Sequence, residues 1–387
     1  MDDATRDVSC VDVEDYVHTG PGTLAGRFFR QFWLAIYQSR DLKPEWSVPV
    51  RILSENLTLY RGASGQVYLV GNRCAHRGAQ LSTGIVDGEG IRCNYHGWKF
   101  DGGGQCVDQP SEPCSFADRV RIKGYPCREY LGLIFAYLGE GKPPEMPRYP
   151  HFEGDGVLFS HQLVRPINFF QNLENSIDEV HIGFLHANSP YEGNINDDVP
   201  IVTTEETEFG LAQFGVRASG KRRETYYHPP TTTSWAQAPT YPEEVGWRDM
   251  LGFRVPIDDK SHITHTVTFA RVSHEKREAF MARRKAEWEE LAKLQSAEEI
   301  ADLVLQGKMR FKDIPWRGNG ADMTRIQDRI ALSGQGVIAD RSLENLGEAD
   351  VAIKLLRSLW TREMTAIRDG KTVKKWLNTM PPPTTGI

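Results

Sequence analysis

Cys74-Ala75-His76 and Cys93-Asn94-Tyr95-His96 are the two short stretches that decide how this 387-residue chain folds. Sixteen residues separate them, and each provides one thiolate and one imidazole on a loop that also contains glycine. Such a set can close around one zinc ion, but two cysteines and two histidines can also hold the two irons of a [2Fe–2S] cluster. The two stretches therefore predict a metal centre, and their residue types fit either a zinc ion or a [2Fe–2S] cluster.

The order of the ligands distinguishes these metals. Structural zinc sites usually place the two cysteines together and the two histidines together, whereas here the residue types alternate. In a Rieske centre, Cys74 and Cys93 would bind one iron, and His76 and His96 the other. Histidine ligation raises the reduction potential to about −150 to +300 mV, well above that of all-cysteine clusters. The ligand order favours the Rieske cluster over zinc.

The neighbouring residues extend this interpretation. The stretches 74–79 (Cys-Ala-His-Arg-Gly-Ala) and 93–101 (Cys-Asn-Tyr-His-Gly-Trp-Lys-Phe-Asp) resemble the two cluster-binding loops of Rieske non-haem iron oxygenases. The resemblance covers nearly the whole chain and is strongest over residues 20–190. It implies the α (oxygenase) subunit of an aromatic ring-hydroxylating enzyme, in the phthalate-dioxygenase-like branch.

A second candidate centre lies between Asn172 and His186, in a segment that we predict to be helical over about 167–186. Asp178 and His181 are three residues apart and would be neighbours on a helix. His181 and His186 are five apart, so an ideal helix would point them about 140° away from each other. Either the helix ends or distorts between them, or a metal ion lies between the two directions.

The string Glu174-Asn175-x-x-Asp178-x-x-His181-x4-His186 resembles the iron-binding helix of the same oxygenases. The resemblance implies that His181 and His186 bind a mononuclear Fe(II). It also implies that Asp178 is a catalytic residue that connects this iron to a Rieske histidine of a neighbouring subunit. Two histidines and one carboxylate would form the facial triad that leaves positions open for O2.

The third ligand of this triad is expected to be a distant carboxylate. The pair Gln327-Asp328 resembles the position that supplies it in the phthalate-dioxygenase-like branch, so Asp328 is our choice. Asp340 is the competing candidate. Beside Arg341 it is better explained as a member of a structural ion pair.

Three regions make up the predicted α+β chain. Residues 1–47 are expected to be an N-terminal helical segment that packs on the catalytic domain. Residues 48–145, with short alternating apolar runs, are expected to form a small antiparallel β Rieske domain. Four prolines within 141–150 indicate a linker, and 146–387 would be the catalytic domain, an antiparallel sheet flanked by helices.

Several elements follow from periodicity. Apolar residues at helical spacing predict a helix over 22–42, and the apolar run Tyr130–Leu138 predicts one buried strand. Strands are expected near 200–218 and 261–272. A last helix contains Ile353 to Ile367, with Gly370 as its stop. The charged stretch 273–307 is expected to be helical; we do not match it to the family, and an insertion would explain it.

Composition excludes several classes of protein. The net charge of −6 does not suggest a nucleic-acid partner. The acidic N-terminus is unlike a signal peptide, and no apolar run approaches the ~20 residues that cross a bilayer, so we expect a cytoplasmic protein without a membrane partner. Six cysteines in such a chain argue against a disulfide framework, and Cys106, Cys114 and Cys127 receive no function.

The resemblance also implies cofactors and partners. O2 would be the co-substrate, and the subunits would form a homotrimer. The chain has neither a dinucleotide-binding glycine motif nor a plant-type ferredoxin cysteine run, so NAD(P)H would act only through a separate ferredoxin or reductase.

The expected reaction is hydroxylation of an aromatic, carboxylated substrate, by ring mono- or dihydroxylation or by oxidative O- or N-demethylation. The alternative is a non-catalytic Rieske electron-transfer protein, which would leave His181 and His186 without a purpose. Arginines of the catalytic domain could pair with a substrate carboxylate. The candidates are Arg217, Arg222, Arg223, Arg248 and Arg254.

Overall fold

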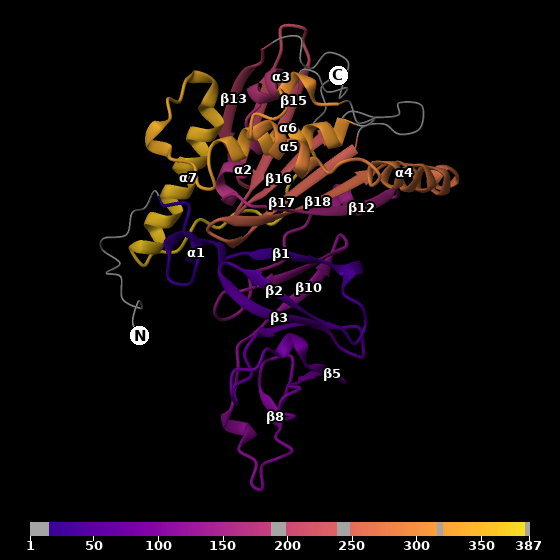
Figure 1. Ribbon diagram of the computed structural model, residues 1–387. Coiled ribbons are helices and arrows are strands. Elements are labelled where there is room, and N and C mark those ends of the chain that lie inside the picture. The colour runs from indigo at the N-terminus through magenta and orange to yellow at the C-terminus, as the bar shows by residue number, and fades with distance from the viewer. Residues whose placement is uncertain (1–14, 187–198, 238–247, 316–319, 384–387) are drawn as a thin grey trace.

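The computed structural model describes residues 15–186, 199–237, 248–315 and 320–383 (Figure 1). Within these residues, seven antiparallel strands in the order β12-β18-β17-β16-β15-β14-β13 form the sheet of the larger half of the molecule. The strands are β12 (Val157–Arg165), β13 (Ile201–Glu206), β14 (Leu211–Val216), β15 (Arg222–His228), β16 (Thr232–Gln237), β17 (Arg248–Asp258) and β18 (Ser261–Ala270).

Helices accompany this sheet, as Figure 1 shows. They are α2 (Phe169–Ser176), α3 (Val180–Leu185), α4 (Arg277–Leu291), α5 (Ala297–Leu305), α6 (Gly320–Gly334) and α7 (Val351–Arg368). An antiparallel sheet flanked by helices was the predicted architecture of this half, and it is confirmed.

Short antiparallel strands build the smaller half, also as predicted. One sheet has the order β1-β11-β10, a second β2-β3-β4-β9 and a third β5-β6-β7-β8. The strands are β1 (Trp33–Gln38), β2 (Ser47–Ile52), β3 (Glu55–Arg61), β4 (Val67–Gly71), β5 (Ile85–Asp87), β6 (Gly90–Arg92), β7 (Lys99–Phe100), β8 (Cys106–Asp108), β9 (Gly124–Tyr125), β10 (Cys127–Tyr130) and β11 (Leu133–Tyr137). The β5–β8 sheet forms the end of the molecule farthest from α3 and α6 (Figure 1).

The prediction of a single helix over residues 22–42 is wrong beyond its first turns. The helix α1 covers only Leu24–Phe29, and residues 33–38 form β1, which pairs with β11. Nearly every side chain of β1 is buried, so its apolar run carries no period that would separate a strand from a helix. The ring centroid of Trp360 in α7 lies 4.8 Å from that of Phe28 and 5.6 Å from that of Phe29, so α1 packs on the larger half. The domain boundaries themselves remain predictions.

The apolar run Tyr130–Leu138 is not one strand. Leu131 and Gly132 have positive φ angles of 51° and 75°, and they turn the chain between β10 and β11. All five residues of β11 are buried. The turn was hidden because one of its residues is leucine, which rarely adopts this conformation.

The C-terminal helix agrees with its prediction. It ends at Arg368, and Gly370 follows with a φ of 68°, the left-handed conformation that glycine adopts most easily after a helix.

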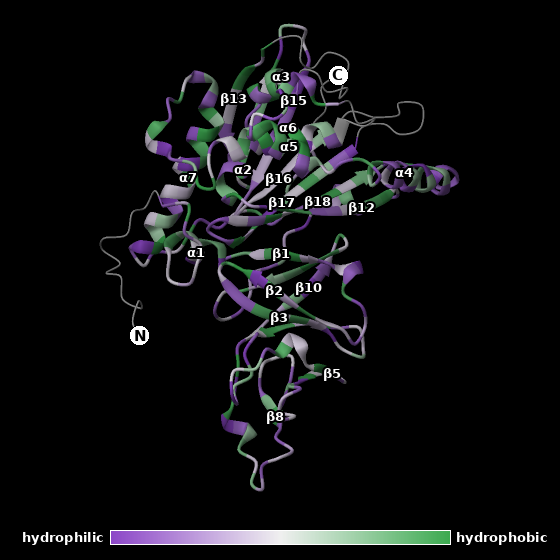
Figure 2. Ribbon diagram, in the orientation of Figure 1, coloured by the Kyte–Doolittle hydropathy of each residue, from purple (hydrophilic) through white to green (hydrophobic). Residues whose placement is uncertain are grey.

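The charged stretch 273–307 contains α4 and α5, and Figure 2 shows α4 as a largely hydrophilic helix. Within the described residues, no helix has both the length and the apolar character needed to cross a membrane.

Candidate metal centres

The loops that contain Cys74 and Cys93 fold into the same turn. In each, the N–H of a glycine four residues on donates to the cysteine carbonyl, Gly78 to Cys74 at 2.9 Å and Gly97 to Cys93 at 3.1 Å. Both glycines have positive φ angles, 71° and 79°. The cysteines are buried, whereas His76 and His96 are partly exposed, and the two imidazole rings lie 4.5 Å apart.

The donor set fits a cluster. Nδ1 of His76 is buried and has no hydrogen-bond partner among the described residues, and the ring of Trp98 stacks on His76 at 4.6 Å. Burial raises the pKa of the Cys74 thiol to about 11, and the neighbouring Cys93 thiol adds to this rise. Two adjacent buried thiols and a buried imidazole nitrogen without a partner are costly unless a ligand satisfies them. These four side chains could hold a [2Fe–2S] group.

The predicted helix over 167–186 is two helices with a break between them. Asn168 caps α2, which ends at Ser176. The carboxylate of Asp178 then accepts hydrogen bonds from the N–H groups of Val180 and His181, at 2.9 and 3.4 Å, and so begins α3. His181 lies in the first turn of α3, and His186 lies just after its end. Between the two histidines the chain is helical up to Leu185, and His186 leaves the helical conformation with φ −101° and ψ 11°.

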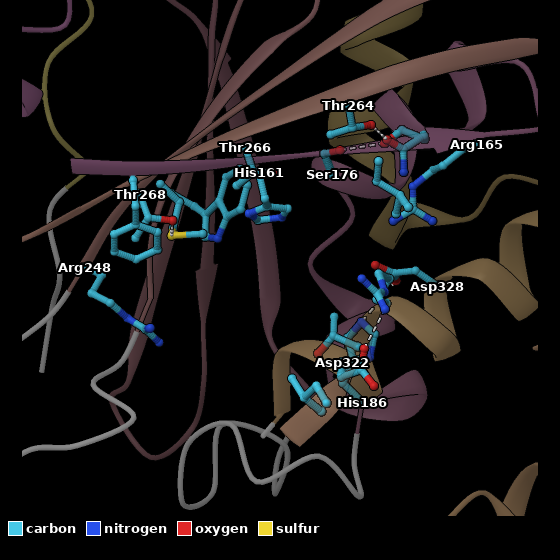
Figure 3. A pocket seen from close by; sticks show the side chains of 18 of the residues that line it. His161, Arg165, Ser176, His186, Arg248, Thr264, Thr266, Thr268, Asp322 and Asp328 are labelled. Atoms are coloured by element: carbon cyan, nitrogen blue, oxygen red, sulfur yellow. Dashed lines mark hydrogen bonds and ion pairs between the residues drawn. The ribbon is translucent and has the colours of Figure 1, made fainter. Parts of the chain in front are cut away.

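Helix α3 and its C-terminal end place the two histidines beside a common carboxylate. Oδ1 of Asp328, on α6, lies 3.2 Å from Nε2 of His186 and 4.0 Å from Nε2 of His181. One donor atom from each of the three residues lies within 4.8 Å of the other two. Figure 3 shows Asp328 and His186 side by side on one wall of a cavity. Two imidazoles and one carboxylate could hold an octahedral iron with open positions.

A hydrogen bond at Nδ1 of each imidazole fixes the orientation of the ring. Nδ1 of His181 lies 2.7 Å from the backbone carbonyl oxygen of Asp178, which can only accept, so the imidazole donates there. Nδ1 of His186 lies 2.8 Å from Oε1 of the buried Gln327. Both rings therefore direct Nε2 at the space beside Asp328. The sequence analysis quoted Gln327 but gave it no role; its position next to Asp328 was the only signal.

The charges in this group suit a dication. Burial alone would raise the pKa of Asp328, but the hydrogen bond from His186 and the nearby His181 outweigh it and lower that pKa to about 2. Burial lowers the pKa of His181. At neutral pH the carboxylate is ionised, and His181 is a neutral imidazole with a free lone pair.

Replacing Gln327 with Leu should weaken iron binding by roughly tenfold, because His186 would lose the acceptor that holds its ring plane and tautomer. Iron content after dialysis against a chelator would measure this. Gln327→Glu, which keeps an acceptor at the same place, is the matched control and should retain iron. Equal loss in both variants would contradict an orienting role.

Asp340 does not join this group. Its carboxylate accepts from the N–H and hydroxyl of Ser342, at 3.0 and 2.6 Å, and caps a short 3-10 turn. The predicted pair with Arg341 is wrong, because Arg341 instead lies 2.9 Å from Glu174 of α2. Within the described residues, Asp340 belongs to no cluster that could bind a metal.

A cavity of about 580 Å³ opens beside His181, His186 and Asp328. Its walls come from one face of β12, β16, β17 and β18 and from helices α2, α3, α4 and α6 (Figure 3). Apolar and aromatic side chains supply much of the lining. They include Phe159, Leu163, Ile182, Trp235, Met250, Phe280 and Trp288.

The five candidate arginines divide into two groups. Arg223, Arg248 and Arg254 line the cavity, whereas Arg217 and Arg222 do not. Arg217 and Arg223 both pair with the buried Glu179, at 3.0 and 2.6 Å, and this pairing holds the start of α3 against β14 and β15. The carboxylate contacts of Arg217 and Arg223 are structural.

Comparison with known proteins agrees with this geometry. Residues 32–126 match the family model of the Rieske [2Fe-2S] domain. Over 363 residues, the chain is 32% identical to the 5,5'-dehydrodivanillate O-demethylase oxygenase subunit of Sphingobium sp., an alignment that covers 92% of this chain and 80% of that protein. The chain belongs to the Rieske non-haem iron oxygenases. It has a Rieske [2Fe-2S] domain and is a terminal oxygenase subunit of the phthalate-dioxygenase-like branch.

Other relatives of this Rieske oxygenase extend the comparison. The phthalate 4,5-dioxygenase oxygenase subunit of Pseudomonas putida is 26% identical over 90% of this chain and 84% of that protein. The oxygenase of carbazole 1,9a-dioxygenase, solved in a complex with ferredoxin, has a TM-score of 0.65 at 20% identity and covers 94% of this chain and 98% of its own. This structural likeness supports the fold.

Proposed function

We propose that this oxygenase hydroxylates an aromatic carboxylic acid, by ring mono- or dihydroxylation or by oxidative O- or N-demethylation. The proposal depends on one observation: His181, His186 and Asp328 converge on the wall of a cavity of about 580 Å³ that is rich in aromatic side chains. A cavity of this size accommodates a small aromatic molecule. An electron carrier needs neither this cavity nor these three residues, so the non-catalytic alternative is not favoured.

In the proposed mechanism, Cys74, Cys93, His76 and His96 would hold the cluster, and His181, His186 and Asp328 would hold Fe(II). When bound, the cluster and the iron would supply the electrons that reduce O2 next to the substrate. The protein orients both imidazoles through Asp178 and Gln327, keeps Asp328 ionised and surrounds the substrate with apolar walls.

Electrons are proposed to cross between subunits. The β5–β8 sheet and the cluster loops lie at one end of the chain, and α3 and α6 lie in the other half (Figure 1). A homotrimer in which the cluster of one subunit faces Asp178 of the next would shorten this path. The side chain of Asp178 is 29% exposed, so its carboxylate can accept an N–H from outside its own chain.

The electron donor is proposed to be a separate ferredoxin or reductase that draws on NAD(P)H. The partly exposed imidazoles of His76 and His96 are the edge of the cluster site that a donor could approach. The solved carbazole 1,9a-dioxygenase oxygenase, which has this fold, forms a complex with ferredoxin.

Metal analysis and a product assay test the proposal. Roughly three iron atoms and two sulfides per chain are expected, against two of each for an electron carrier. Reduced protein would then be mixed with O2 and aromatic carboxylates, with and without methoxy groups. Formaldehyde released with substrate loss identifies demethylation, and a phenol or diol without formaldehyde identifies ring hydroxylation. A protein with two iron atoms and no product from any acid would overturn the proposal.

A further inference from the structure

Strand β12 presents a row of side chains to the cavity. Phe159, His161, Leu163 and Arg165 alternate along the strand and all line the cavity wall. Successive strand residues face opposite sides of a sheet, so this register places Arg165 on the same face as the apolar residues. Figure 3 shows Arg165 on the side of the cavity that holds Asp328, whereas Arg248 lies near Thr268 on the other side.

Most of the cavity's arginines are already engaged. Arg223 pairs with Glu179 at 2.6 Å, and Arg325 pairs with Asp322 at 2.8 Å. Arg254 donates to the side chains of Asn172 and Thr233, at 2.9 and 2.7 Å. Arg248 and Arg284 have partners as well.

Arg165 differs from these five. Among the described residues, none forms an ion pair or a hydrogen bond with its guanidinium. Its Nε is buried without a partner, as are those of Arg248 and Arg325, but these two arginines have partners for other parts of the guanidinium or side chain. A guanidinium does not give up its proton in a protein, so this charge cannot be removed by titration. Burying such a group without a partner costs free energy that an incoming anion would recover.

Asp328, the carboxylate on the same side of the cavity, attracts Arg165 but forms no ion-pair contact with it. The ion-pair contacts of Asp328 are with His181 and His186, at 4.0 and 3.2 Å. If this carboxylate and the two imidazoles hold a dication, the group carries a net positive charge. Arg165 and this group would then be two positive centres on the same side of the cavity, and both would favour an anion beside them.

We propose that Arg165 binds the carboxylate of the aromatic substrate. This inference rests on the proposed function and adds the residue that selects the substrate class. The planar guanidinium can donate two parallel hydrogen bonds to a carboxylate, a geometry that lysine cannot reproduce. The carboxylate end of the substrate then lies on the Asp328 side of the cavity.

Isothermal titration calorimetry of the oxidised holoenzyme with 4-methoxybenzoate and its neutral analogue 4-methoxybenzamide tests this inference. The wild-type protein should bind the carboxylate more tightly than the amide. Arg165→Gln should weaken carboxylate binding roughly 10- to 100-fold and leave amide binding nearly unchanged. The carboxylate affinity of Arg165→Lys should lie between that of the wild type and that of Arg165→Gln. Arg248→Gln, which removes an arginine from the other side of the cavity, is the matched control and should keep the carboxylate affinity.

Any of three results in the variants would overturn the inference: full carboxylate affinity in Arg165→Gln, equal loss of affinity for both ligands, or a loss that appears in Arg248→Gln instead. A wild-type protein that does not prefer the carboxylate would also overturn it. Iron and sulfide content of each variant shows whether the metal sites survive. The product assay separately decides the proposed function, so an oxygenase that forms products without dependence on Arg165 would refute this inference alone.

Discussion

His186→Ala is expected to lose the mononuclear iron and all product formation while it keeps the Rieske cluster. Nε2 of His186 lies 3.2 Å from Oδ1 of Asp328, the shorter of the two imidazole–carboxylate distances in the group. Without this imidazole, only one histidine and one carboxylate would remain, too few to form the facial triad. Iron should fall from about three to about two per chain, with about two sulfides retained.

His161→Ala is the matched control for this experiment. His161 also lines the cavity, but it belongs to no cluster of metal-binding side chains in the described part of the chain. This variant should retain its full iron content. Unchanged iron in His186→Ala, or equal loss in His161→Ala, would contradict the assignment of the triad.

Asp178→Asn is expected to retain both metals and lose activity by roughly 100-fold or more. The Asp178 side chain accepts hydrogen bonds from the N–H groups of Val180 and His181. An asparagine side-chain oxygen can accept the same two bonds, and the backbone carbonyl that orients His181 is unchanged. Helix α3 and the iron should therefore persist, whereas the negative charge proposed to receive the neighbouring cluster histidine would be gone.

Two measurements separate this role from a structural one. The cluster of reduced Asp178→Asn should remain reduced when substrate and O2 are added, which its visible spectrum would report. Asp178→Ala removes the cap as well, so it should also lose iron. Activity retained in Asp178→Asn, or iron lost from it, would refute an electron-transfer role for this carboxylate.

The cluster loops could be predicted in detail because their information is local. All four proposed ligands fall within residues 74–96, and each loop needs only its own glycine turn to form. The final helix could also be predicted, since its apolar period and the glycine after it are both short-range signals. Predictions failed where an apolar run had no period, as in β1, or where a turn used leucine, as at residue 131.

The distant part of the catalytic site depended on resemblance. Gln327 and Asp328 reach His186 across about 140 residues of sequence, and no spacing within a helix or strand predicts such a contact. The five-residue spacing of His181 and His186 indicated that the helix ends between them or that a metal lies between their directions, and the structure shows that α3 ends at Leu185. Arg165 was overlooked because sequence does not show which arginines have a partner.

The class of this protein, a Rieske oxygenase with an antiparallel β cluster domain and an α+β catalytic half, could be predicted without the structure. Ligand types, their order and local turn chemistry are properties of neighbouring residues, so they can be recognised without coordinates. The folded structure was needed to show that α6 brings Asp328 to His181 and His186, and that Arg165 lines the cavity without an ion-pair partner among the described residues. Both facts arise from long-range packing of a sheet and its helices, which depends on all the contacting residues together.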